Sequence, residues 1–137
     1  IMGVENDGFY IRSFNNAKLP KNTVLSISGV RIKISSTNAD TSALKTRKEN
    51  SANAIILNSG NYTAGTDFPT GTYSIAAHSG NGNVSSSNII GYGINAIMGV
   101  DDGDFYEKKY YNIDFTKNGT TLSVSGLTIK LIPVSVT

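Results

Sequence analysis

The 137-residue sequence contains no cysteine, no tryptophan, one histidine and three prolines. The lack of cysteine excludes disulfides, thiolate metal ligands and a cysteine nucleophile. A single histidine cannot build a histidine-rich metal site. No apolar run approaches the roughly 20 residues of a membrane-spanning helix, so this stretch of chain is not expected to cross a membrane.

Charge is also scarce in this sequence. Charged residues make up 16% of the chain and the net charge is +2, which provides no strong field for nucleic acid or anionic lipid. Ser, Thr, Asn and Gly are abundant, at 16, 13, 15 and 14 residues, and their excess excludes a coiled coil or an Ala/Leu-rich bundle. The hydrophobic content of 39% suffices for a core. The chain opens on Ile1 without a signal region, so we expect a fragment whose targeting segment lies outside it.

An internal repeat links the two ends of the sequence. Residues 1–4 recur at residues 97–100 as Ile-Met-Gly-Val, and residues 25–34 resemble residues 122–131. The offset between the copies is 96 at first and 97 later, which predicts one gained residue near Phe105 to Tyr111.

The repeat divides the chain into three expected segments. Residues 1–35 correspond to the C-terminal half of a first repeat, and residues 54–137 form a complete second repeat. Residues 36–53 carry few large apolar groups and are interpreted as a linker, with a short helix at residues 41–45, capped by Asp40, as the alternative. A half copy cannot bury a sandwich face alone. We therefore expect it to pack on the complete copy, on strands upstream, or on another chain in a homodimer formed by strand exchange.

Apolar and polar residues alternate with a period of two, as in half-buried strands. The phase slips by one residue at Ser28-Gly29 and again at Ser125-Gly126. This slip predicts a two-residue hairpin turn in each copy, and a glycine bulge within one long strand is the alternative. Residues 79–83 are interpreted as a loop that ends a strand. Strands are expected at residues 25–34, 55–57, 62–64, 73–77, 94–100, 111–115 and 122–131. The pattern predicts an all-β fold, an antiparallel, jelly-roll-like β-sandwich built from one complete repeat and a half repeat.

Residues 60–75 follow the pattern Gly-x-Tyr-x-x-Gly-x-Asp-x-Pro-x-Gly-x-Tyr-x-Ile, with Gly-Asn-Val at residues 82–84 and Leu-Ser-Val-Ser-Gly-Leu at residues 122–127. This combination resembles an uncharacterised β-rich domain of secreted or cell-surface proteins of Gram-positive bacteria. The resemblance implies an extracytoplasmic setting and a binding or structural role by analogy, and it brings no catalytic residues. The glycines and the proline of the pattern are turn positions.

Two acidic loops are the candidate metal sites. The first contains Glu5, Asn6 and Asp7, and the second contains the candidate calcium ligands Asp101, Asp102 and Asp104. Closely spaced oxygen ligands can begin a calcium shell, although other loops must complete it because the EF-hand spacing is lacking. The alternative interpretation is that aspartate and glycine supply turn geometry there.

Aromatic residues cluster beside the second acidic loop. Phe105, Tyr106, Tyr110 and Tyr111 are the candidate ligand-binding residues, because exposed rings stack on sugars or anchor a protein partner. The first copy is aromatic in the same region, at Phe9, Tyr10 and Phe14. Packing of these rings in the core is the alternative.

No motif frames a catalytic residue. His78 has no nucleophile elbow near it, and Gly80-Asn81-Gly82 does not lead into a helix as a phosphate loop does. We therefore predict a non-enzymatic module without a catalytic site. The alternative is a carbohydrate-active hydrolase with paired carboxylates near Asp67 and Asp104.

Overall fold

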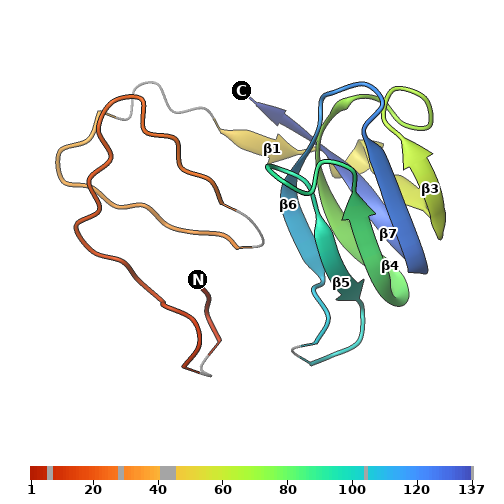
Figure 1. Ribbon diagram of the computed structural model, residues 1–137, viewed down its shortest axis with the longest axis horizontal. Coiled ribbons are helices and arrows are strands. Elements are labelled where there is room, and N and C mark those ends of the chain that lie inside the picture. The colour runs from red at the N-terminus through yellow and green to blue at the C-terminus, as the bar shows by residue number, and fades with distance from the viewer. Residues whose placement is uncertain (6–7, 28–29, 41–45, 104, 137) are drawn as a thin grey trace. The chain divides into compact units, whose positions relative to one another are not determined.

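The computed structural model describes residues 1–5, 8–27, 30–40, 46–103 and 105–136. The chain divides into two compact units, Ile1–Ser35 and Ser36–Thr137. The second unit is all-β. Its seven strands form one antiparallel sheet that curls into a half-barrel (Figure 1). In the described ranges no helix has the length and apolar character needed to cross a bilayer.

Two long strands form the centre of the sheet. β4 (Gly71–Ser86) and β7 (Thr121–Val136) have 16 residues each and pair along most of their length. The other edge of β7 pairs with three short strands, β1 (Arg47–Glu49), β2 (Ile55–Leu57) and β3 (Gly60–Thr63). The other edge of β4 pairs with β6 (Lys109–Phe115) and β5 (Asn95–Gly99).

The structure corrects two sequence predictions about the long strands. The hairpin predicted at Ser125-Gly126 is wrong, because β7 runs unbroken through these residues and the alternative, a glycine bulge, is present. The loop predicted at residues 79–83 is also wrong, since these residues continue β4. The pairing of β4 with β7 is irregular between Ala77 and Ser79 and between Gly80 and Asn83, and the extra residues there keep the apolar side chains on one face. Leu122 and Val124 precede Gly126, Leu127 and Ile129 follow it, and all four apolar side chains are buried.

Three glycines let the two long strands approach at this bulge. Gly126 has a φ of 83° and Gly80 a φ of 75°, a region that glycine enters without steric cost. Gly82 faces the backbone of β7, and a Cβ there would overlap the carbonyl oxygen of Ser125. The glycines predicted to make a flexible loop therefore allow close backbone packing between two central strands.

The concave side of the half-barrel holds the core. Its buried apolar side chains come from β2, β4, β5, β6, β7 and the loops between them, and include Phe68, Tyr73, Ile75, Val84, Ile94, Met98, Ile113, Phe115, Leu122, Ile129 and Leu131. Three of these rings pack edge to face: Phe68 lies 5.6 Å from Tyr73 and 5.3 Å from Phe115. Such pairs stabilise the core beyond the burial of their area.

An ion pair joins the two edges of the curled sheet. Lys109 of β6 donates to Glu49 of β1 at 2.8 Å, and both side chains are about 30% exposed. β1 and β6 belong to opposite edges, with β7 and β4 between them. A flat sheet would hold them three strand spacings apart, about 14 Å. The ion pair is therefore evidence that the sheet curls. Residues 36–53, which were expected to be a linker, contribute the edge strand β1 and the short 3-10 helix Ser51–Asn53.

Most of the strands expected in the second repeat are confirmed. β2 has the expected bounds, and strands lie at the positions expected for β3, β5, β6 and the start of β4. In the first unit the outcome differs. Residues 25–27 and 30–34, expected as strand, are not assigned to one, while Ser28, Gly29 and the alternative helix at residues 41–45 lie outside the described residues.

The close approach at Gly82 predicts a large cost for a small side chain. We expect Gly82→Ala to lower the free energy of unfolding by about 2–3 kcal/mol, because the new Cβ forces β4 away from β7. Gly119→Ala is the control for backbone strain without a clash: unlike Gly82, Gly119 has a positive φ, 90°, and it has open space around it, so about 1–2 kcal/mol is expected. Urea unfolding measures both. A Gly82→Ala variant no less stable than the control would contradict this packing.

Candidate functional site

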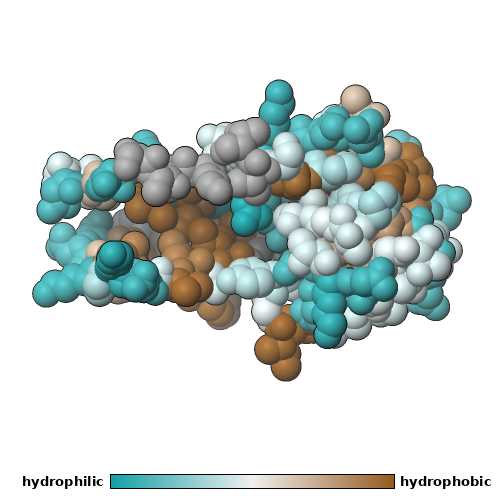
Figure 2. Space-filling model, turned by 90° about the horizontal axis from the view of Figure 1, so that it is seen from above, coloured by the Kyte–Doolittle hydropathy of each residue, from teal (hydrophilic) through white to brown (hydrophobic). Residues whose placement is uncertain are grey.

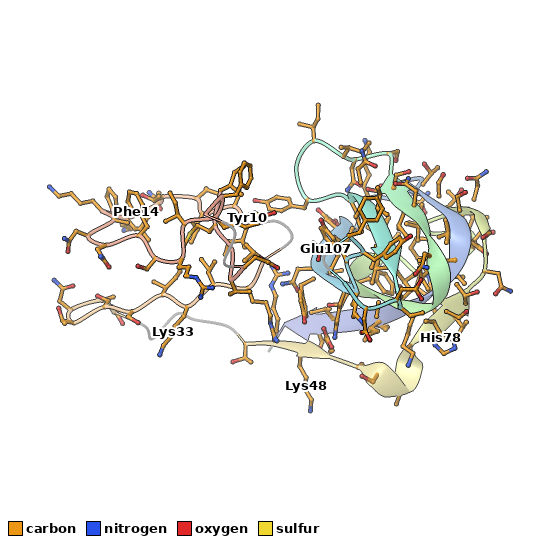
Figure 3. The ribbon with its side chains drawn as sticks, turned by 90° about the horizontal axis from the view of Figure 1, so that it is seen from below. Tyr10, Phe14, Lys33, Lys48, His78 and Glu107 are labelled. Carbon is orange, nitrogen blue, oxygen red and sulfur yellow. The ribbon has the colours of Figure 1, made fainter. Side chains whose placement is uncertain are left out.

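The loop between β5 and β6 holds most of the predicted site residues. Two backbone hydrogen bonds close it: Gly99 N donates to Glu107 O, and Glu107 N donates to Ile97 O, both at 3.0 Å. An isolated bridge pairs Met98 with Glu107, and the Met98 side chain is fully buried. The base of the loop is thus fixed on the half-barrel (Figures 1 and 3).

Two of the four predicted aromatic residues lie together at the end of this loop. The rings of Phe105 and Tyr106 pack edge to face, with centroids 5.1 Å apart and an interplanar angle of 88°. Phe105 is 71% exposed, whereas Tyr106 is half-buried. The less exposed ring supports the exposed one, so the loop presents Phe105 in a defined position.

The other two predicted aromatic residues belong to strand β6. Tyr110 is half-buried and packs against the core. The amino group of Lys109 lies 5.0 Å from the ring centroid of Tyr111, a cation–π contact. The structure therefore separates the predicted aromatic cluster into a loop pair, of which Phe105 is exposed and Tyr106 half-buried, and two strand residues with packing roles.

Asp101 and Asp102, the described members of the predicted calcium site, have other partners. The carboxylate of Asp101 accepts a hydrogen bond from the Asn81 amide on β4. Asp102 forms a 3.1 Å ion pair with Lys108, whose amino group also donates to the carbonyl oxygen of Val100. Among the described residues no group of three or more His, Cys, Asp or Glu side chains could hold a metal ion. Asp104 lies outside them.

Asn81 was not predicted from the sequence as a partner of this loop. It lies 20 residues before Asp101 and reaches the loop because β4 and β5 pair with Asn81 opposite Gly99. Only the strand register brings the two side chains together. In contrast, the Asp102–Lys108 pair links residues of one loop.

The first unit contains a loop of the same geometry. Gly3 N donates to Ile11 O at 3.2 Å and Ile11 N donates to Ile1 O at 3.0 Å, which are the two closing bonds of the β5–β6 loop shifted by 96 residues. The rings of Phe9 and Tyr10 pack edge to face at 5.2 Å and 87°. Asn6 and Asp7, the other acidic-loop candidates with Glu5, lie outside the described residues.

The pattern at residues 60–75 serves the turn between β3 and β4. The Tyr73 hydroxyl donates to the carbonyl oxygen of Pro69 at 2.6 Å, and burial raises the pKa of this tyrosine. A carboxylate oxygen of Asp67 accepts a hydrogen bond from Thr63 N at 2.7 Å. A side chain at Gly65 would overlap Asn118. These contacts explain the spacing of the pattern as turn geometry.

Of the two carboxylates predicted for the alternative hydrolase, Asp104 lies outside the described residues, so only Asp67 can be compared with the described part of the acidic loop. The turn with Asp67 lies beside Thr120, because Ala64 N donates to Thr120 O. The loop that begins at Asp101 lies at the other end of β6 (Figure 1). Seven strand residues separate the two ends by about 20 Å. Glycosidase carboxylates act at roughly 5–10 Å. His78, expected at a strand end, is instead exposed at an irregularity in the middle of β4.

A carboxyl group with a displaced pKa lies at the end of β6. The hydroxyl of Thr116 donates to Asp114 at 2.6 Å and the Thr116 backbone N–H donates at 2.8 Å. Both bonds stabilise the carboxylate and lower the pKa of Asp114. The direction is opposite to that of a general acid, which needs a raised pKa.

Removal of the Thr116 hydroxyl should raise the pKa of Asp114 toward its ordinary value of 3.8. A lowered folded-state pKa contributes stability above the unfolded-state pKa and loses it as pH falls through the folded-state pKa. We therefore expect Thr116→Val to be less stable than the wild type at pH 7 and to lose this deficit as the pH falls through the lowered folded-state pKa of Asp114. NMR titration of the Asp114 carboxyl carbon measures the pKa, with Thr128→Val as the control. An unchanged Asp114 pKa in Thr116→Val would refute the assignment.

Calcium binding at the acidic loop stays a prediction with a direct test. If Asp101 and Asp102 bind calcium, millimolar CaCl2 raises the melting temperature relative to EDTA, and Asp101→Asn removes the rise. Equal melting temperatures in CaCl2 and EDTA would show that these carboxylates serve only Asn81 and Lys108.

Comparisons with known proteins add no relative: no protein-family model, no curated protein and no solved structure matches this chain. The likeness to β-rich domains of Gram-positive surface proteins therefore stays a prediction from the sequence pattern.

Proposed function

We propose that this chain is a non-enzymatic, extracytoplasmic binding or structural module of a bacterial surface or secreted protein, and that its β5–β6 loop contacts the partner. The observation that carries the proposal is Phe105, a large apolar side chain that is 71% exposed and held against Tyr106. An exposed ring in a fixed position loses little entropy on binding, which is why aromatic residues dominate interface energetics.

The corresponding loop of the first unit supports the same role. Phe9 is 65% exposed and packs on Tyr10 as Phe105 packs on Tyr106. Edge-to-face packing alone would favour burial of both rings. Instead each loop keeps its phenylalanine accessible, so one chain offers two similar contact points and can gain affinity for a partner with repeated sites.

The partner class that fits this setting is a protein or a carbohydrate of the cell surface. A carbohydrate-active hydrolase remains the alternative, and release of reducing sugar ends from cell walls would favour it. The jelly-roll-like sandwich of one complete and one half repeat also belongs to this proposal and rests on the sequence repeat.

Cosedimentation with Gram-positive cell walls tests the binding proposal. We expect the wild type to pellet with the walls and the double variant Phe9→Ser, Phe105→Ser to bind at least about tenfold more weakly. Ile90→Ser is the control, since Ile90 is another large apolar residue without an aromatic ring, 99% exposed on the β4–β5 loop.

Protease treatment of the walls separates the two partner classes. Binding that survives the treatment identifies a carbohydrate, and binding that is lost identifies a protein. Failure of the wild type to pellet with untreated walls, or equal binding by the double variant, would contradict the role of the loop.

A further inference from the structure

Beyond the aromatic loop, the first unit shares two turn features with the β5–β7 region. Asn16 and Asn112, 96 residues apart, both have a positive φ, 59° and 58°. The turn closed by Thr23 N donating to Pro20 O, at 3.0 Å, corresponds at an offset of 97 to the turn closed by Thr120 N donating to Lys117 O, at 3.2 Å. The gained residue therefore lies between residues 112 and 117, not between Phe105 and Tyr111 as predicted.

The corresponding apolar side chains differ sharply in exposure. Met2 is 37% exposed and its counterpart Met98 is fully buried. Leu25 is 47% exposed whereas Leu122 is fully buried. Ile34 is 61% exposed, against full burial for Leu131. Apolar surface accordingly shows on the N-terminal part of the chain (Figure 2).

The strand that helps to bury the corresponding side chains in the half-barrel is β4. In the half-barrel, β4 pairs with β7 along one edge and with β6 and β5 along the other. Residues 1–35 contain sequence counterparts of β5, β6 and β7 but none of β4. Within the described residues of this unit, the only β-pairing is the bridge between Met2 and Ile11.

The β4 strand of a second copy of this chain cannot fill the place. Residues 72–86 of β4 pair with β7, and residues 71–76 and 81–85 pair with β6 and β5. Between these two stretches, Ala77 N donates to Lys108 O and Gly80 O accepts from Val100 N. Both edges of β4 are occupied, and residues 1–137 contain one β4 beside two sets of β5–β7 counterparts.

We propose that residues 1–35 form a strand-accepting surface whose partner is a further copy of the repeat segment typified by residues 54–96. Its β4-type strand enters between the counterpart of β7, residues 25–34, and the counterparts of β5 and β6, residues 1–18. Recognition uses backbone pairing along both edges of the added strand and burial of alternate apolar side chains. The added strand keeps the glycines equivalent to Gly80 and Gly82, the positions at which β4 approaches the backbone of β7 most closely.

Side chains of the first unit fit this partner. Tyr10 and Phe14 lie in the first unit (Figure 3), as counterparts of Tyr106 and Tyr110, and Tyr110 packs against the core of the half-barrel. Lys33 corresponds to Lys130, which lies opposite Ala76 of β4. The first unit thus carries the residue types that surround β4 in the second.

The test is an extended chain in which a second copy of residues 54–96 precedes Ile1 directly, as Ala96 precedes Ile97. We expect amide hydrogen exchange at residues 25–34 to slow at least about a hundredfold relative to the 137-residue chain, with both proteins monomeric by light scattering. The control is the same extension with the position equivalent to Gly82 changed to valine, because a side chain at Gly82 would overlap the backbone of β7 in the half-barrel.

Three results would overturn the proposal. Equal exchange at residues 25–34 in the extended and original chains shows that the added strand does not dock. Slowing by the valine control shows that docking does not follow β4 geometry. Protection of residues 1–35 in a dimer of the original chain shows that a second copy is the partner. None of these readouts depends on binding through Phe105, so the two proposals fail separately.

Discussion

The backbone approach of β4 and β7 at their glycine bulge is the constraint on which the half-barrel depends. Both strands are 16 residues long, and strands of this length must coil to bury one face. Gly80, Gly82 and Gly126 allow the approach where any side chain would strike the opposite backbone. The inserted residues keep the apolar side chains on the concave face on both sides of the bulge. The curl then brings β1 and β6 close enough for Lys109 and Glu49 to pair.

The alternation of apolar and polar residues predicted the type of structure well, because whether a segment forms a strand depends largely on this local pattern. The all-β class, the antiparallel pairing and the position of most strands in residues 54–137 follow from it. It could not decide between a hairpin and a bulge at Ser125-Gly126, because both produce the same one-residue slip. The pairing of β7 with β4 on one side and β1–β3 on the other decides the matter. This depends on contacts far apart in the sequence, as does the hydrogen bond from Asn81 to Asp101.

The candidate site was predicted in its location but not in its internal arrangement. The sequence placed aromatic and acidic residues together after β5. The structure divides them by role: Phe105 is presented, Tyr110 packs against the core, and Asp101 and Asp102 hold the loop through Asn81 and Lys108. The repeat adds a second loop with the same closing bonds. Residues 46–136 thus form a half-barrel centred on β4 and β7, whereas the described residues of the first unit leave exposed the apolar side chains whose counterparts the half-barrel buries.

Native-state amide exchange on the unmodified 137-residue chain tests this contrast most directly. Residues 25–34 and 122–131 are similar in sequence, so differences in exchange report the presence or absence of β4 beside them. The account predicts slow exchange at residues 122–131 and fast exchange at residues 25–34 in the same monomeric sample. Equal protection of the two segments would contradict the central claim that pairing with β4 is what makes this sequence a strand.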